Sequence, residues 1–406
     1  MYLRLLCYLT ICACLASATL SAQSVQDLRV DVIYLASDYL EGRETGKRGE
    51  DLAAEYIATR FADMGLQPLG DDGSFYQFFD FQFSTNPHSR VGETRSGRNV
   101  IGYLDNGAPT TVVIGAHYDH IGRGGFGSRA PNVKEIHNGA DDNASGVGAL
   151  LYLAERLQKS DLKGQNYLFI AFSGEEMGLY GSKHFVKEPT VDFNRVSCML
   201  NLDMVGRLDE KKSLIINGAG TSPYWKEAFA KITEPVLDVT TTDSGIGASD
   251  HTSFYLADLP ALHFFTGNNT DYHTPTDDSE KINFVGIQEV AEWMYGLLEQ
   301  LDAAGKLTFT KTKDNTGRRA SSFKVTLGVM PDYAHSGEGM RLDAVIDDRP
   351  GQKAGLKDGD VIIKIGDLVV KDIYDYMEGL GKYEKGQTTT VVVKRGEEEL
   401  TYEVTF

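Results

Sequence analysis

The sequence GAHYDH at 115–120 ends an apolar run that begins at Thr111, and NGADDNASG at 138–146 precedes a helical pattern. An apolar run without polar alternation is typical of a strand that is covered on both faces of a sheet. A glycine-rich loop joins the two segments, so a histidine and an acidic pair can meet across one cleft. We interpret this stretch as half of a two-metal hydrolytic site.

Neighbouring segments extend the pattern of apolar runs and helical periodicity. Strands are predicted at 75–83, 99–104, 167–172, 197–202 and 259–265, and helices at 50–64, 146–158 and 285–301. This alternation predicts an α/β fold, with a mostly parallel or mixed twisted sheet sandwiched by helices. In such folds the ligand site lies outside the carboxyl ends of the strands.

Candidate metal ligands follow the ends of four of these predicted strands, and one more precedes a helix N-terminus. They are His117, Glu175 with Glu176, Asp203, His273 and, before the helix, Asp142. Paired hydrolytic metal ions bind histidine and carboxylate ligands. We assign His117, Asp142 and Asp203 to one ion. Asp142, Glu176 and His273 are assigned to the other, with Asp142 as the bridge.

Three residues near these ligands are candidate catalytic groups. Glu175 is the candidate general base, which would take a proton from a metal-bridged water and give it to the leaving amine. Asp119 is placed to accept the second ring N–H of His117, and Tyr272 to stabilise the tetrahedral oxyanion.

Four other histidines lie near these segments. His120 and His137 are expected to be loop residues or to support the ligands, because neither has a matching strand-end partner. His251 and His263 are expected to be structural.

Five motifs in order resemble the secreted di-zinc aminopeptidases of peptidase clan MH, of the bacterial leucyl aminopeptidase type. They are HYD at 117–119, GADDNASG at 139–146, SGEE at 173–176, NLDM at 201–204 and DYHT at 271–274. The resemblance covers roughly residues 25–305. It implies the zinc aminopeptidase fold, two Zn²⁺ ions and the ligands and base given above. It also implies Asp142 rather than Asp141 as the bridge, with a cis peptide bond to Asn143.

The C-terminal residues 323–406 form a separate unit of short predicted strands at 324–329, 342–346, 361–365, 388–393 and 400–406, with a helix near 374–380. This unit resembles a bacterial PDZ domain, on TLGV at 326–329 and RPGQKAGLKDGDVI at 349–362. The resemblance implies that Leu327, Gly328 and Val329 bind peptide C-termini beside a strand edge. Pro331 has no N–H at that edge, so a domain that packs on the catalytic unit without binding a peptide is an equal alternative.

The N-terminal residues and the net charge indicate where the protein is located and which partners it does not bind. Residues 1–22 carry an apolar run from Leu5 to Leu20 that is closed by small residues, which is typical of a secretory signal peptide. We therefore expect a secreted or periplasmic protein, with a lipoprotein anchored at Cys14 as the weaker alternative. The net charge of −18 argues against nucleic acid as a partner. After the signal peptide, Cys198 is the single cysteine, which excludes a disulfide framework.

The predicted organisation is a signal peptide (1–22), a catalytic domain (23–307), a linker (308–322) and a PDZ-like domain (323–406). The predicted function is a zinc exopeptidase that removes N-terminal residues from peptides. A glutaminyl cyclase-like acyltransferase and a non-catalytic peptide-binding protein are the alternatives. The preferred N-terminal residue, carboxypeptidase activity and the native metal are left open, because histidine and carboxylate sites accept several divalent ions.

Overall fold

The computed structural model describes residues 25–83, 93–125, 127–130, 132–312, 325–331, 338–345, 349–371, 373–396 and 398–406. The predicted signal peptide lies outside the described residues, as does the linker from residue 313 onward. Within the described ranges, none of the helices is both long enough and apolar enough to cross a membrane.

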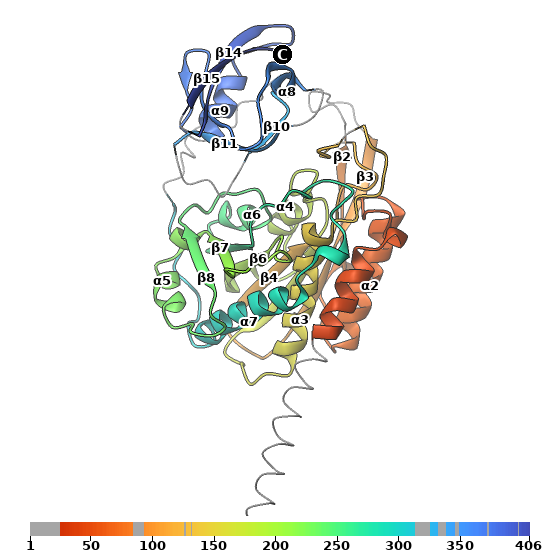
Figure 1. Ribbon diagram of the computed structural model, residues 1–406. Coiled ribbons are helices and arrows are strands. Elements are labelled where there is room, and N and C mark those ends of the chain that lie inside the picture. Colours follow the sequence, from red (N-terminus) through yellow and green to blue (C-terminus); the bar gives the residue numbers. More distant parts are fainter. Residues whose placement is uncertain are drawn as a thin grey trace, which may run out of the picture.

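A mixed nine-stranded sheet organises the first domain (Figure 1). Its strands are β1 (Gln67–Pro68), β2 (Tyr76–Phe83), β3 (Glu93–Leu104), β4 (Thr111–His117), β5 (Asn166–Phe172), β6 (Val196–Leu202), β7 (Ser213–Asn217), β8 (Asp238–Thr242) and β9 (Ala261–Phe265). The order is β1-β3-β5-β4-β6-β9-β7-β8, with β2 paired to β3. The central strands β5, β4, β6 and β9 are parallel, and β3 and β7 flank them in antiparallel pairs.

Helices cover both faces of this sheet, as predicted. They are a helical segment at 25–35, α2 (Arg48–Asp63), α3 (Gly146–Gln158), α4 (Tyr180–Lys187), α5 (Tyr224–Phe229), α6 (His251–Tyr255) and α7 (Phe284–Leu301). Short helical turns are η1 (Asp38–Leu40), η2 (Asp71–Gly73), η3 (Ala140–Ser145), η4 (Phe193–Arg195), η5 (Ala219–Thr221) and η6 (Ser279–Lys281).

The hydrophobic core lies in two layers, one on each face of the sheet. Val112 and Ile114 of β4 belong to the layer under α2, α3 and α7, while Val113 belongs to the layer with Phe185 of α4 and Phe254 of α6. Successive side chains of a strand point to opposite faces, so a strand between two layers must be apolar throughout. All seven residues of β4 are buried, which explains the continuous apolar run.

β7 and β8 were not predicted from the sequence. β8 is short, and its five residues DVTTT are all exposed or half-buried, so no apolar run marks it. It pairs with β7 at the edge of the sheet. Backbone pairing, rather than side-chain burial, therefore places this strand.

The C-terminal domain is an antiparallel sheet with its own core. Its elements are β10 (Val329–Pro331), β11 (Met340–Val345), α8 (Pro350–Ala354), β12 (Val361–Ile365), β13 (Leu368–Val369), α9 (Ile373–Leu380), β14 (Thr388–Arg395) and β15 (Glu398–Thr405). The strand order is β10-β11-β12-β14-β15, with β13 on β12. β10 begins only at Val329, because Gly328 before it has a φ of +69°. Leu327, Ile362 and Val391 are central to a core separate from those of the first domain.

The start of the predicted linker packs against the first domain. Phe309 packs beside the layer of α4 and α6. The Thr310 N–H donates to the Thr221 carbonyl at 2.8 Å, and the Thr312 N–H donates to the Tyr255 hydroxyl at 3.1 Å. Residues 308–312 are thus attached to the catalytic domain.

Candidate metal centre

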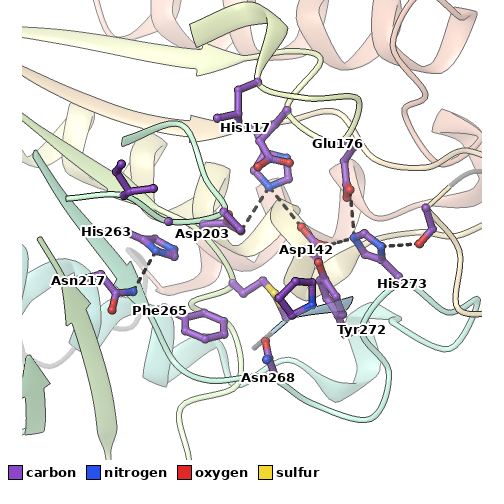
Figure 2. A pocket seen from close by; sticks show the side chains of 18 of the residues that line it. His117, Asp142, Glu176, Asp203, Asn217, His263, Phe265, Asn268, Tyr272 and His273 are labelled. Atoms are coloured by element: carbon purple, nitrogen blue, oxygen red, sulfur yellow. Dashed lines mark hydrogen bonds and ion pairs between the residues drawn. The ribbon is translucent and has the colours of Figure 1, made fainter. Parts of the chain in front are cut away.

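The predicted ligands converge on one cavity of about 520 Å³ at the carboxyl ends of the central strands. Figure 2 shows His117, Asp142, Asp203, Glu176 and His273 pointing toward one another across it. They come from the ends of β4, β5 and β6, from the loop after β9 and from η3. The parallel strands explain this convergence, because their carboxyl ends lie at the same edge of the sheet.

The side chains form two adjoining groups that share Asp142. In one group, His117 Nε2 lies 3.2 Å from Asp142 Oδ1 and 3.3 Å from Asp203 Oδ1. In the other, His273 Nε2 lies 3.0 Å from Asp142 Oδ2 and 3.0 Å from Glu176 Oε2. The two oxygens of Asp142 therefore face different groups, which is the geometry that a bridging carboxylate requires.

These donor sets fit divalent metal ions. Within each group the candidate ligand atoms lie within 4.8 Å of one another, and nearly all the side chains are buried. His273 Nε2 is buried and, among the described residues, faces the carboxylate oxygens of Asp142 and Glu176 without a hydrogen bond to them. Nitrogen and carboxylate oxygen donors around a buried point are the set that zinc binds.

Both candidate ligand histidines, His117 and His273, are oriented through their other ring nitrogen. His117 Nδ1 lies 3.2 Å from the carbonyl oxygen of Asp119, and His273 Nδ1 lies 2.7 Å from the carbonyl oxygen of Gly127. An N–H at Nδ1 leaves Nε2 as the free lone pair, which is the arrangement found in metal-binding histidines.

The Asp119 carboxylate lies near His117 and also binds the turn that carries Glu175 and Glu176. Its Oδ1 is 3.7 Å from His117 Nδ1, which is too far for a direct hydrogen bond. The ring N–H is instead accepted by the main-chain carbonyl oxygen of Asp119. The carboxylate accepts the N–H groups of Glu175 at 3.2 Å and Glu176 at 3.4 Å. Gly174 precedes them with a φ of +73°, which favours glycine. Asp119 thus fixes the turn that carries both glutamates.

The loop that carries Asp142 is clamped from both sides. Asp277 Oδ2 accepts the N–H groups of Asp141 and Asp142 at 2.9 and 3.1 Å. Asp141 points away from the ligands, because its oxygens accept from the Gly206 N–H and the Asn269 amide. The peptide bond between Asp142 and Asn143 is cis, as the resemblance implied.

The electrostatics of the ligands reflect burial and mutual attraction. Burial disfavours the charge of Glu176, but attraction by His273 outweighs burial and lowers the pKa of Glu176 to about 2. Burial likewise opposes ionisation of Asp142, whose pKa is nevertheless well below its ordinary value because the rings of His117 and His273 lie against its two oxygens. Positive charge at these two points stabilises the carboxylates, and divalent cations would supply it.

Glu175 differs from its neighbour. Burial raises the pKa of Glu175 well above the ordinary value, His117 opposes the rise, and the charge of Glu176 adds to it. Glu175 lines the cavity, and so does Tyr272, whose ring stacks on His273 with centroids 4.0 Å apart. Burial also raises the pKa of Tyr272, so its hydroxyl keeps its proton and can donate a hydrogen bond.

The structure places the remaining histidines in distinct settings. His120 is buried, and its Nδ1 lies 2.7 Å from Glu176 Oε1, while its ring centroid lies 5.5 Å from that of His273. His263 lines the cavity, bonds to Asn217 and stacks on His251. His137 contacts the hydroxyl of Ser128. Sequence spacing gave no reason to join His120 to Glu176, because 56 residues separate them.

Arg43 is a further residue that sequence reasoning missed. Its guanidinium is buried beneath the site and donates to the carbonyl oxygens of Leu35, Tyr118, Asn138 and Gly139. Burial lowers the pKa of Arg43 to about 10, although the nearby Asp142 and Asp119 oppose the change. Arg43 thus joins the two halves of the stretch at 115–146. A lone arginine in a loop gives no sequence signal for this role.

The three predicted peptide-binding residues of the C-terminal domain, Leu327, Gly328 and Val329, each contact a different part of the structure. Leu327 is buried, and its carbonyl oxygen accepts from the Gly351 N–H. The Gly328 N–H donates to the hydroxyl of Thr326 at 2.9 Å. Val329 lines the cavity that holds the predicted metal ligands.

The fold and the site together define the class of protein. It is an α/β protein in which one edge of the sheet carries two adjoining sets of buried histidine and carboxylate side chains. Residues 99–298 match the sequence model of peptidase family M28, and residues 313–406 match that of the PDZ domain.

Similar proteins agree with this assignment. Aminopeptidase YwaD from Bacillus subtilis (strain 168) is 34% identical over 194 residues, which are 45% of this chain and 39% of that protein. The chain spans between 39% and 58% of the length of the first curated relatives that it matches.

Two solved structures show the same fold. BSAP, a zinc aminopeptidase from Bacillus subtilis, has a TM-score of 0.55 with 19% identity, over 70% of this chain and 95% of that chain. Porphyromonas gingivalis glutaminyl cyclase has a TM-score of 0.54 with 18% identity, over 68% of this chain and 98% of that chain. At these identities the likeness concerns the fold alone.

Proposed function

We propose that the protein is a two-zinc aminopeptidase that removes the N-terminal residue of peptides. One observation carries the proposal: both ligand groups and Glu175 border a single cavity that is large enough for a residue and the peptide bond that follows it. The name of the relative with 34% identity, an aminopeptidase, supports the same activity.

The residues divide the chemistry among themselves. His117, Asp142 and Asp203 would hold one ion, and Asp142, Glu176 and His273 the other. When bound, the two ions supply Lewis-acid polarisation of the scissile carbonyl and of the attacking water. Glu175 takes the proton from that water and delivers it to the leaving nitrogen. Tyr272 donates a hydrogen bond to the carbonyl oxygen as negative charge develops there.

The lining of the cavity favours an N-terminal substrate over a C-terminal one. Among the described residues that line it there is no lysine or arginine to pair with the carboxylate of a C-terminal residue. Leu179, Met204, Ile246 and Phe265 add an apolar wall. We expect an N-terminal residue with an aliphatic side chain to bind best.

The test uses the purified protein with two equivalents of Zn²⁺ and matched peptides that have a free or an acetylated N-terminus. Release of N-terminal leucine from the free peptide only is the expected result, with loss of activity on chelation and recovery on adding zinc. Cleavage of the acetylated peptide from its C-terminus would replace the proposal with carboxypeptidase activity. Formation of pyroglutamate from an N-terminal glutamine peptide, without hydrolysis of the leucine peptide, would favour the glutaminyl cyclase alternative.

We also propose that the mature protein acts after export, on the basis of the apolar run from Leu5 to Leu20. N-terminal sequencing of the protein from the expressing bacterium should give a start between Ala18 and Gln23. An intact Met1 in the isolated protein would contradict it.

A further inference from the structure

The cavity that holds the ligands is lined by residues of both domains. Val329 and Pro331 of β10 border it together with His117, Glu176 and His273. β10 is the edge strand of the PDZ sheet, and it lies on the side of that domain that faces the catalytic domain (Figure 1). The edge at which the PDZ resemblance implies peptide binding is thus part of the active-site cleft.

An ion pair joins the two domains beside this wall. Arg129 Nη2 lies 2.8 Å from Asp358 Oδ2 of the PDZ domain. On the catalytic side, the Arg129 N–H donates to the carbonyl oxygen of His273. On the PDZ side, Asp358 Oδ1 accepts the Val345 N–H, and Val345 is the partner of Val329 in the β10–β11 pair. A short path of contacts therefore links the position of His273 to that of Val329.

A substrate that is cut after its first residue must extend out of the cavity. Its N-terminal residue occupies the part nearest the two ligand groups, and the following residues leave along the outer walls. Val329 and Pro331 present uncharged, apolar surface to this route. Pro331 has no N–H, so recognition at that end of β10 depends on side-chain contact rather than on strand pairing.

We propose that β10 of the PDZ domain is a specificity wall of the active site, which selects an apolar residue at the second position of the peptide. This inference rests on the proposed aminopeptidase function. The PDZ domain then serves in selecting the substrates of the adjoining active site.

Two peptides that differ only at the second residue, Leu-Leu-Ala-Ala and Leu-Lys-Ala-Ala, test the wall in the full-length zinc protein. The readout is the ratio of their kcat/KM values within one variant, because a general loss of folded or metal-loaded enzyme cancels in the ratio. The wild type should prefer the leucine peptide. Val329→Asp should lower that ratio by roughly tenfold, because a carboxylate in the wall disfavours leucine and attracts lysine.

Val369→Asp is the matched control, since Val369 lies on β13 of the same domain with 55% of its surface exposed. It should leave the ratio at the wild-type value. A ratio that does not move in Val329→Asp, in a wild type that cleaves both peptides, overturns the specificity wall and leaves the aminopeptidase proposal standing. Failure of the wild type to cleave either peptide counts against the proposed function itself.

A charge swap tests whether the ion pair holds the wall in place. Asp358→Arg alone should move the ratio by about threefold, the small effect expected of one partly exposed ion pair. The double variant Arg129→Asp with Asp358→Arg should restore part of this change, because the ion pair reforms while the Asp358 bond to the Val345 N–H stays lost. Identical ratios in the wild type and in Asp358→Arg would show that this contact does not position β10, and would contradict that part of the inference.

Discussion

At the scale of single residues, Glu175 and Glu176 show how neighbours in the sequence acquire different roles. The turn that carries them is fixed by Asp119, which accepts both of their N–H groups. Glu176 contacts both His120 and His273, while Glu175 lines the cavity. One is therefore placed to bind a cation and the other to exchange protons.

Replacing the proposed general base tests this division. Glu175→Gln should lower kcat by about 100- to 10,000-fold, because glutamine cannot take a proton from water. Zinc content by elemental analysis should stay at the wild-type value, since Glu175 is not one of the proposed ligands. Glu55→Gln on the exposed face of α2 is the control and should behave as wild type. Full activity of Glu175→Gln would rule out the assigned role.

His120 gives a second prediction at this scale. His120→Ala removes the hydrogen bond to Glu176, and we expect the affinity for the ion held by Glu176 and His273 to fall about 10- to 100-fold. His120→Asn keeps an N–H donor near the position of Nδ1 and should recover most of that affinity. Zinc retained against a graded chelator series measures both variants. Equal zinc affinity in His120→Ala and wild type would mean that His120 does not position Glu176.

At the scale of elements, Asn143 ties together the segments that carry two ligands. Its amide donates to the Leu202 carbonyl at 3.0 Å, and its oxygen accepts from the Gly146 and Met204 N–H groups at 2.9 and 3.1 Å. The start of α3 is thus fastened to the end of β6, so that Asp142 and Asp203 face the same point.

Truncation of this side chain should be costly. Asn143→Ala leaves three buried main-chain groups without partners, and we expect the free energy of unfolding to fall by about 3 kcal/mol or more. Urea denaturation followed by circular dichroism measures it. Asn194→Ala, at an exposed position, should change the free energy of unfolding by less than about 0.5 kcal/mol. A similar small change in Asn143→Ala would show that these bonds contribute little.

At the scale of the whole molecule, two domains with separate hydrophobic cores meet at one cavity. Ile362 is fully buried in the PDZ core, and Leu200 is fully buried in the catalytic core. Because the domains share few described contacts beyond the cavity lining and the ion pair of Arg129 with Asp358, we expect them to unfold as separate units.

Calorimetry of the full chain tests this expectation. Ile362→Ala should destabilise the PDZ domain by about 2–5 kcal/mol and lower one of two thermal transitions, because it leaves a cavity in that core. Leu200→Ala should lower the other. A single transition that both variants shift equally would contradict independent unfolding.

The amino-acid sequence by itself determined the central sheet and the edge that carries the ligands. Strands buried on both faces must be apolar throughout, so β4, β5 and β6 can be predicted from continuous apolar runs in the sequence. Parallel strands bring their carboxyl ends together, so the sequence alone predicts His117 and Asp203 at one edge of the sheet.

Tertiary structure alone decided the contacts that depend on segments far apart in the chain. His120 meets Glu176 across 56 residues, and Arg43 reaches Gly139 across 96. Val329 enters the cavity because a second domain lies against the first. Periodicity reports which face of an element is buried, but it carries no information about which distant side chain lies opposite. Those pairings arise only when the domains fold and pack together.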